Sequence, residues 1–152
     1  MRYWLIKSEP TTYGIEHIAK DKKTSWTGIR NYQARNFMRD QMKVGDRAFF
    51  YHSNCEPPGI VGIVEVSAPA HPDKTQFDPK SPYYDAASVR EAPRWLNVEF
   101  RFLKKTALIS LADLKTHKKL EKMRILQRGN RLSITPVDPA EWSYITDKLM
   151  KA

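Results

Sequence analysis

Two tryptophans, Trp26 and Trp95, are the residues best suited to bind a flat heterocycle. Trp26 lies shortly before Gly28, in a segment too short to form a core element alone. Trp95 precedes an alternating strand pattern whose apolar face carries Leu96 and Val98, so its own ring points to the other side. Each ring therefore needs a cover, supplied either by the rest of the chain or by a ligand.

If the two rings face each other across a slot, they would sandwich a nucleobase, with stacking worth about 1–3 kcal/mol per base. A methyl group on that base would add apolar contact, so the slot would favour a methylated base. The alternative is structural. Trp26 would then be a satellite core residue beneath the helix that follows it, and the proline-rich segment 67–93 would cover Trp95.

A base-specific site also needs hydrogen-bonding groups, because stacking does not distinguish one base from another. Asn31 offers a donor and an acceptor together, although it could equally cap the helix after it. Gly28 would allow the backbone to approach a ring closely, or would serve only as a turn residue. The ends of two predicted strands supply further candidates for the rim of a pocket: Ser8, Tyr51, His52 and Ser53.

The chain is strongly basic, with 26 Lys and Arg against 17 Asp and Glu and a net charge of +9 at pH 7. Such a charge attracts polyanions, of which nucleic acid is the commonest, although basic surfaces often have no specific partner. Contacts to phosphates would position a strand without recognising its sequence. The candidates are Arg30, Arg35 and Arg39 beside the proposed slot, and Lys118, Lys119 and Arg131 in a second basic stretch, where a solvated face is the alternative.

The sequence contains few signals of an enzyme, so we expect no catalytic residue, metal or cofactor. The four histidines are scattered without the spacing of a zinc site, and GxGxxG, Walker, GxSxG and HExxH motifs are absent. A nucleophilic pair of Cys55 and His52 would need residues three apart at a strand exit to meet correctly.

The sequence also indicates where the protein works. The single cysteine cannot form an internal disulfide, which fits a reducing compartment. The first residues have no charged segment leading into a long apolar stretch, so no secretory signal is expected, and no apolar run approaches the ~20 residues of a membrane span. We therefore expect a cytoplasmic protein with no membrane partner, and we assume a monomer.

The patterning predicts a single domain over residues 1–152, without repeats or a dividing linker. Strand patterns cover residues 2–9, 47–53, 59–66, 94–105 and 130–137. Helix signals lie near Thr12, Gln33, Ser110 and Asp138, and a long ordered loop is expected over 67–93. Short strands and helices thus interleave without long crossovers, which predicts a mixed α/β fold with a curved or barrel-like sheet flanked by short helices.

Several blocks resemble one known family closely. They are "WTGIRNYQARNFMRDQMKVGDRAFFYHS", "PPGIVGIVEV", "PDKTQFD", "YYD", "PRW" and "RLSITPV", in this order along nearly the whole chain. The sequence is on these grounds similar to the EVE domain family, whose fold is PUA-like and related to the YTH domain. The resemblance implies a module that binds modified bases such as 5-methylcytosine and its hydroxymethyl form.

Carried onto matching positions, the resemblance implies that Trp26 and Trp95 are the stacking walls and that Asn31 contacts the edge of the base. Ser8 and the run from Tyr51 through His52 to Ser53 would line the pocket. Gly28 would supply close backbone, and Tyr32 and Arg94 would form the rim.

The leading hypothesis is a non-enzymatic module that captures a methylated or hydroxymethylated base of DNA or RNA in an aromatic pocket. Two alternatives belong to other classes. One is an unselective PUA-like RNA-binding protein, with steep salt dependence and little base discrimination. The other is a nucleotide-processing hydrolase that uses the same pocket.

Overall fold

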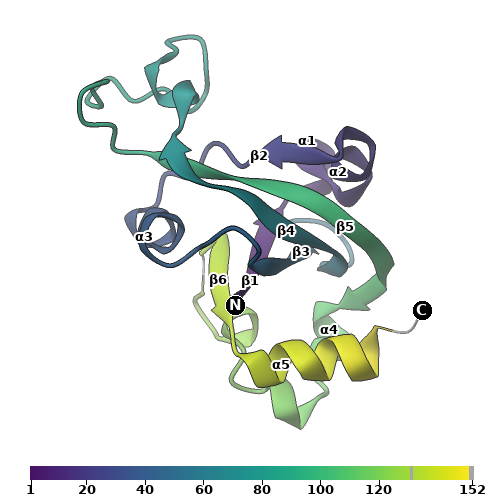
Figure 1. Ribbon diagram of the computed structural model, residues 1–152. Coiled ribbons are helices and arrows are strands. Elements are labelled where there is room, and N and C mark those ends of the chain that lie inside the picture. Colours follow the sequence, from purple (N-terminus) through teal and green to yellow (C-terminus); the bar gives the residue numbers. More distant parts are fainter. Residues whose placement is uncertain (131, 151–152) are drawn as a thin grey trace.

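A six-stranded mixed sheet forms the framework of the computed structural model, which describes residues 1–130 and 132–150 (Figure 1). The strand order is β2-β5-β4-β3-β1-β6. β1 pairs in parallel with β3, and the other neighbours pair antiparallel. The strands are β1 (Tyr3–Ser8), β2 (Lys23–Ser25), β3 (Arg47–His52), β4 (Gly59–Pro72), β5 (Leu96–Ser110) and β6 (Ile134–Val137).

The two long strands, β4 and β5, bend along their length (Figure 1). Their pairing shifts register at four places, and such irregularities bend a strand and increase its twist. Within the described residues no pairing joins β2 to β6, so the sheet bends without closing into a barrel. The predicted mixed α/β fold with short flanking helices is confirmed.

Short helices connect the strands, and capping side chains begin several of them. Asn31 accepts a hydrogen bond from the Ala34 N–H at 3.0 Å, and Ser110 does the same for Asp113 at 3.1 Å. The α-helices are α1 (Pro10–Tyr13), α2 (Ile15–Asp21), α3 (Tyr32–Asp40), α4 (Leu111–Leu114) and α5 (Pro139–Tyr144). The 3-10 helices are η1 (Lys74–Phe77), η2 (Lys118–Leu120) and η3 (Arg124–Leu126). A π-helical turn, η4 (Ile145–Leu149), follows α5.

Both faces of the sheet are buried, because successive side chains of a strand point to opposite faces. Ile6 and Phe50 belong to a core that also contains Trp26 and residues of α3. Their neighbours Leu5 and Phe49 belong to a second core, which contains Trp142 of α5. The cavity described below is built on the first core.

The segment from residue 73 to 95 is an ordered loop held together by buried polar groups. Gln76 is completely buried, and its amide nitrogen donates to the carbonyls of Asp73 at 2.7 Å and Trp95 at 2.8 Å. Its amide oxygen accepts from the Ser88 hydroxyl at 2.5 Å and from the Trp95 N–H at 3.0 Å. The loop begins later than predicted, because β4 continues to Pro72.

Replacing Gln76 should therefore loosen this loop. Gln76→Ala leaves buried backbone groups without partners, and we expect a loss of about 1–3 kcal/mol in the free energy of unfolding. Gln33→Ala is the matched control, because Gln33 is exposed on α3 and its loss should cost under about 0.5 kcal/mol. Urea denaturation measures both variants, and equal losses would contradict the role assigned to Gln76.

Candidate functional site

A cavity of about 560 Å³ opens where β1, α1 and β2 meet the segment after β2. Its volume falls within the range of small-molecule sites. Aromatic, hydroxyl-bearing and charged residues are among those that line it: Lys7, Ser8, Glu9, Thr12, Tyr13, Thr24, Ser25, Trp26, Thr27, Gly28, Ile29, Tyr83 and Ser133. The cavity therefore combines aromatic and polar residues in one lining.

Trp26 forms an aromatic part of the lining and is fixed by the core behind it. Its ring meets Phe50 at 5.7 Å and Phe100 at 5.6 Å between centroids, both edge to face. Its backbone N–H donates to the Val98 carbonyl at 2.8 Å. Only 8% of the residue is exposed. Trp26 thus fulfils both expectations, as a core residue and as a residue that lines the candidate site.

Tyr83 supplies another aromatic ring of the cavity, and Gly28 makes its position possible. A Cβ atom built on Gly28 would lie 2.7 Å from the Tyr83 ring, so only glycine admits that close approach. Gly28 also has φ +86°, a conformation that L side chains rarely adopt. Tyr83 remains 38% exposed, which leaves ring surface available to a ligand.

Ser8 and Tyr13 form a hydrogen-bonded part of the lining. The Ser8 hydroxyl donates to the Tyr13 carbonyl at 2.6 Å, and the Tyr13 hydroxyl donates to Asp21 at 2.8 Å. Burial, reinforced by the hydrogen bond to Asp21, raises the pKa of Tyr13 to about 12. Tyr13 therefore stays neutral across the physiological range, and its ring meets the Trp26 ring edge to face.

Lys7 and Glu9 are charged residues in the wall of the cavity, and the Lys7 side chain leaves β1 on the face of Leu5, opposite to that of Ile6. Glu9 accepts a hydrogen bond from the Asn54 side chain at 3.0 Å. Lys7 forms no ion pair within residues 1–130 and 132–150, and burial lowers the pKa of its ammonium group. A partly desolvated cation without a carboxylate partner is suited to an anionic group of a ligand.

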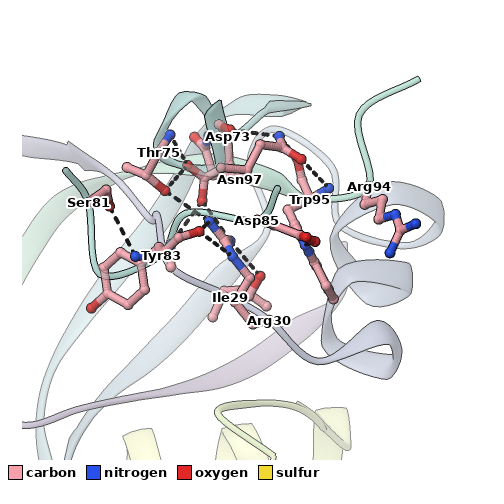
Figure 2. Close-up of polar contacts among 12 residues, drawn as sticks. Ile29, Arg30, Asp73, Thr75, Ser81, Tyr83, Asp85, Arg94, Trp95 and Asn97 are labelled. Carbon is pink, nitrogen blue, oxygen red and sulfur yellow. Dashed lines mark hydrogen bonds and ion pairs between the residues drawn. The ribbon is translucent and has the colours of Figure 1, made fainter. Parts of the chain in front are cut away.

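Arg30 and Asp73 form an ion pair next to Tyr83 (Figure 2). The carboxylate of Asp73 is fully buried and accepts from the Gly28 N–H at 2.9 Å and from Arg30 at 3.1 Å. It also accepts from the Thr75 N–H at 2.8 Å and the Thr75 hydroxyl at 2.5 Å. Burial alone would raise the pKa of Asp73, but these hydrogen bonds outweigh it and hold the pKa below its usual value.

Trp95 does not face Trp26, contrary to the expectation of two parallel indole walls. Its ring stacks on Tyr32 with centroids 4.8 Å apart, and its indole N–H donates to Asp85 at 2.8 Å. The Arg30 guanidinium lies between the Tyr83 and Trp95 rings, 5.7 and 5.5 Å from their centroids (Figure 2). Trp95 is therefore covered by its own chain, although by Tyr32 and Arg30 more than by the proline-rich segment, which contributes the hydrogen-bond acceptor Asp85.

Three further predicted pocket residues hold other parts of the fold. Asn31 uses its side-chain oxygen to cap α3, so the structural alternative holds for it too. Tyr51 is buried in the second core, on the other side of the sheet from Trp26. His52 accepts from the Ile15 N–H at 3.1 Å and so holds the start of α2, and burial lowers the pKa of its imidazole.

The last three predicted pocket residues also lie outside the lining. The Ser53 N–H donates to the Ser8 carbonyl at 3.0 Å and extends the contact between β1 and β3. Tyr32 is exposed and covers Trp95. The Arg94 side chain points away from the Arg30–Asp73 pair (Figure 2). Of the ten predicted pocket residues, the structure brings Ser8, Trp26 and Gly28 together around the cavity.

The predicted phosphate contacts are mostly engaged within the protein. The Arg30 guanidinium donates to Asp73, Thr75 and the Tyr83 carbonyl. Arg35 donates to Asn36 and to the Arg94 carbonyl. Arg39 pairs with Asp40 at 2.8 Å on the surface of α3. Lys118 and Lys119 lie in η2, at the far end of the molecule from the 73–95 loop (Figure 1), and Arg131 lies outside the described residues.

Two negative findings apply to the described part of the chain, residues 1–130 and 132–150. It contains no cluster of three or more His, Cys, Asp or Glu side chains placed to hold a metal ion. None of its helices has the length and apolar character that crossing a membrane requires.

Comparison with known proteins places this geometry in a family. A family model described as the EVE domain matches residues 2–148. The chain belongs to the EVE family. Thymocyte nuclear protein 1 from Gallus gallus is 43% identical over 163 residues, covering 94% of this chain and 66% of that protein. The Homo sapiens protein of the same name is 39% identical over 162 residues, covering 94% and 72%. This chain thus spans only about two thirds of the length of such relatives.

Solved structures of EVE relatives agree with the fold. A crystal structure from Pseudomonas putida has a TM-score of 0.92 at 42% identity, covering 95% of this chain and 97% of that one. A structure of human THYN1 in complex with DNA containing 5-methylcytosine also has a TM-score of 0.92, at 38% identity, covering 100% and 99%. An ASCH protein from Zymomonas mobilis, at 12% identity and TM-score 0.58, shares the fold alone.

Sequence reasoning missed Lys7, Tyr13, Asp73 and Tyr83 as parts of the site. Tyr83 carried a weak signal, since an aromatic residue in a proline-rich loop indicates that the loop packs against the domain. Asp73 carried another, because an Asp two residues before Thr75 is typical of a turn closed by the Asp side chain. Neither signal indicates which side chains meet across the cavity.

The contact of Gly28 with Tyr83 can be tested by adding one methyl group. Gly28→Ala should lower the free energy of unfolding by more than the roughly 1–2 kcal/mol that a left-handed conformation costs an L residue. The control is Gly45→Ala, at φ +97° with nothing within 4 Å of the new Cβ. Thermal unfolding should show a larger loss at Gly28, relieved when Tyr83→Ala is added, and equal losses at both glycines would contradict the contact.

Proposed function

We propose that this EVE domain is a non-enzymatic module that captures a methylated or hydroxymethylated base of DNA in the cavity between Trp26 and Tyr83. The observation that carries the proposal is that these two aromatic residues line one cavity of suitable size. The human relative, which matches over the full chain, supports DNA with 5-methylcytosine as the class of partner.

Capture would begin with extrusion of the base from the duplex, which costs a few kcal/mol. Stacking on aromatic rings returns about 1–3 kcal/mol per base, and contacts to the strand supply the remainder. A methyl group in apolar contact adds about 0.8 kcal/mol, which corresponds to about a fourfold gain in affinity. The hydroxyls and carbonyls around Ser8 and Thr27 would accept or donate at the edge of the base.

The cavity supports binding better than hydrolysis. The Ser8 hydroxyl donates to a backbone carbonyl, and the ring nitrogen of His52 that could act as a base accepts from the Ile15 N–H. Neither group has the nucleophile–base contact that covalent catalysis needs. We therefore propose that bound nucleotides leave unchanged. Turnover of free nucleotides that is lost in His52→Ala would instead favour the hydrolase.

Tyr83 gives the sharpest test of base capture. Tyr83→Ala should lower the affinity for an oligonucleotide with 5-methylcytosine by about fivefold or more, because it removes a stacking surface. Tyr84→Ala is the matched control, since Tyr84 is the next residue, 44% exposed and outside the lining. Fluorescence anisotropy with modified and unmodified oligonucleotides measures both variants. Equal wild-type affinity for the two oligonucleotides would contradict capture of a modified base and favour unselective RNA or DNA binding.

Lys7 is proposed to contact a phosphate of the bound strand. Lys7→Met should weaken binding of modified and unmodified oligonucleotides by the same factor and reduce the slope of log affinity against log salt by about one. Because burial lowers the pKa of Lys7, its charge is lost at a lower pH than that of a surface lysine. Wild-type affinity should accordingly fall as the pH rises toward the alkaline range, and Lys7→Met should lack this phase.

The cytoplasmic location and the single-domain organisation over residues 1–152 stay predictions. A tagged chain imaged in its native cell would test the location, and limited proteolysis would test the domain.

A further inference from the structure

We propose that Arg30 and Asp73 position Tyr83 as a wall of the cavity and thereby set how strongly a modified base is preferred over an unmodified one. This inference rests on the proposed function. Arg30 was expected to contact phosphate, yet its guanidinium is hydrogen-bonded to Asp73, Thr75 and the Tyr83 carbonyl (Figure 2). It acts through Tyr83 and is a positioning residue.

The first step is the contact between Arg30 and the backbone of Tyr83. Arg30 donates to the Tyr83 carbonyl through Nε at 3.0 Å and through Nη2 at 2.7 Å. Two donors of a rigid planar group on one carbonyl restrict both the position and the direction of that peptide. The ring of the same residue then has little freedom to move away from Gly28.

The second step is the shared carboxylate of Asp73. It accepts from the Gly28 N–H beneath the Tyr83 ring and from Nη1 of Arg30, which holds the Tyr83 backbone. The contacts thus form a closed cycle from Asp73 to Gly28, to the Tyr83 ring, to Arg30 and back to Asp73. Thr75 closes it further, because its hydroxyl accepts from Arg30 at 3.0 Å and donates to Asp73.

The third step connects the cycle to discrimination. The preference for a methyl group depends on close contact, and a gap of about 0.5–1 Å forfeits roughly a quarter to a half of the attraction between two surfaces. Phosphate contacts act over longer distances and are insensitive to such a shift. A loosened Tyr83 wall should therefore lower the ratio of modified to unmodified affinity, while affinity for unmodified DNA changes little.

The test is a double-mutant cycle on that ratio, with four proteins: wild type, Arg30→Lys, Tyr83→Ala and the double variant. Arg30→Lys keeps the charge but cannot place two donors on one carbonyl. We expect it to lower the ratio by about twofold or more in the wild-type background and to leave it unchanged when Tyr83 is already alanine. Arg124→Lys, an exposed charge-matched control in η3 and outside the cavity lining, should leave the ratio at its wild-type value.

Thr75→Val provides a second, milder variant in case Arg30→Lys folds poorly. It removes one acceptor of the Arg30 fork with little change in shape, and we expect the same direction of change in the ratio. An unchanged ratio in both single variants, or an equal drop in the Tyr83→Ala background, would overturn the positioning role. A wild-type ratio of one would overturn the proposed function itself, so the two failures can be told apart.

Discussion

The buried carboxylate of Asp73 is the constraint on which the candidate site depends. Placing an ionised group in the interior is costly unless its oxygens are fully hydrogen-bonded. Asp73 meets that requirement with donors from Gly28, Arg30 and Thr75. The donors come from two segments more than forty residues apart in the chain, so solvating the charge and joining the segments are one event. The hydrogen bonds that Asp73 requires therefore also hold Tyr83 beside Gly28.

Trp26 and Tyr83, the two proposed stacking residues, are held in different ways. Trp26 is fixed from behind by Phe50 and Phe100, so its position follows from the packing of the sheet. Tyr83 has no comparable core beneath it, and polar contacts to its backbone place it. The position of Trp26 therefore depends on the core, whereas the position of Tyr83 depends on the fold of the 73–95 loop. This division is typical of sites in which a stable scaffold presents an adjustable loop.

Local patterns predicted the framework well because they depend on near neighbours. Alternation placed Val98 and Phe100 in the core, and Ser110 and Asp138 capped helices as their spacing indicated. Sequence did not place Trp95 against Tyr32, because the partner of Trp95 is decided by how a 23-residue loop folds back, which no periodicity encodes. Nor did it pair Arg30 with Asp73, since a basic residue looks the same in sequence whether it faces solvent or a buried carboxylate. Long-range pairings of loop residues are thus the part that the sequence leaves open.

The cavity combines residues from the two ends of the chain. Ser133 lines it together with Lys7 and Ser8, and the Lys7 N–H donates to the Ser133 carbonyl at 2.8 Å. β1 is flanked on this side by β6, the last strand of the described sheet in chain order. A nascent or clipped polypeptide that stops short of β6 lacks one boundary of the site and leaves an edge of β1 unpaired. Assembly of the ligand cavity consequently requires the complete sheet and cannot precede the pairing of β6 with β1.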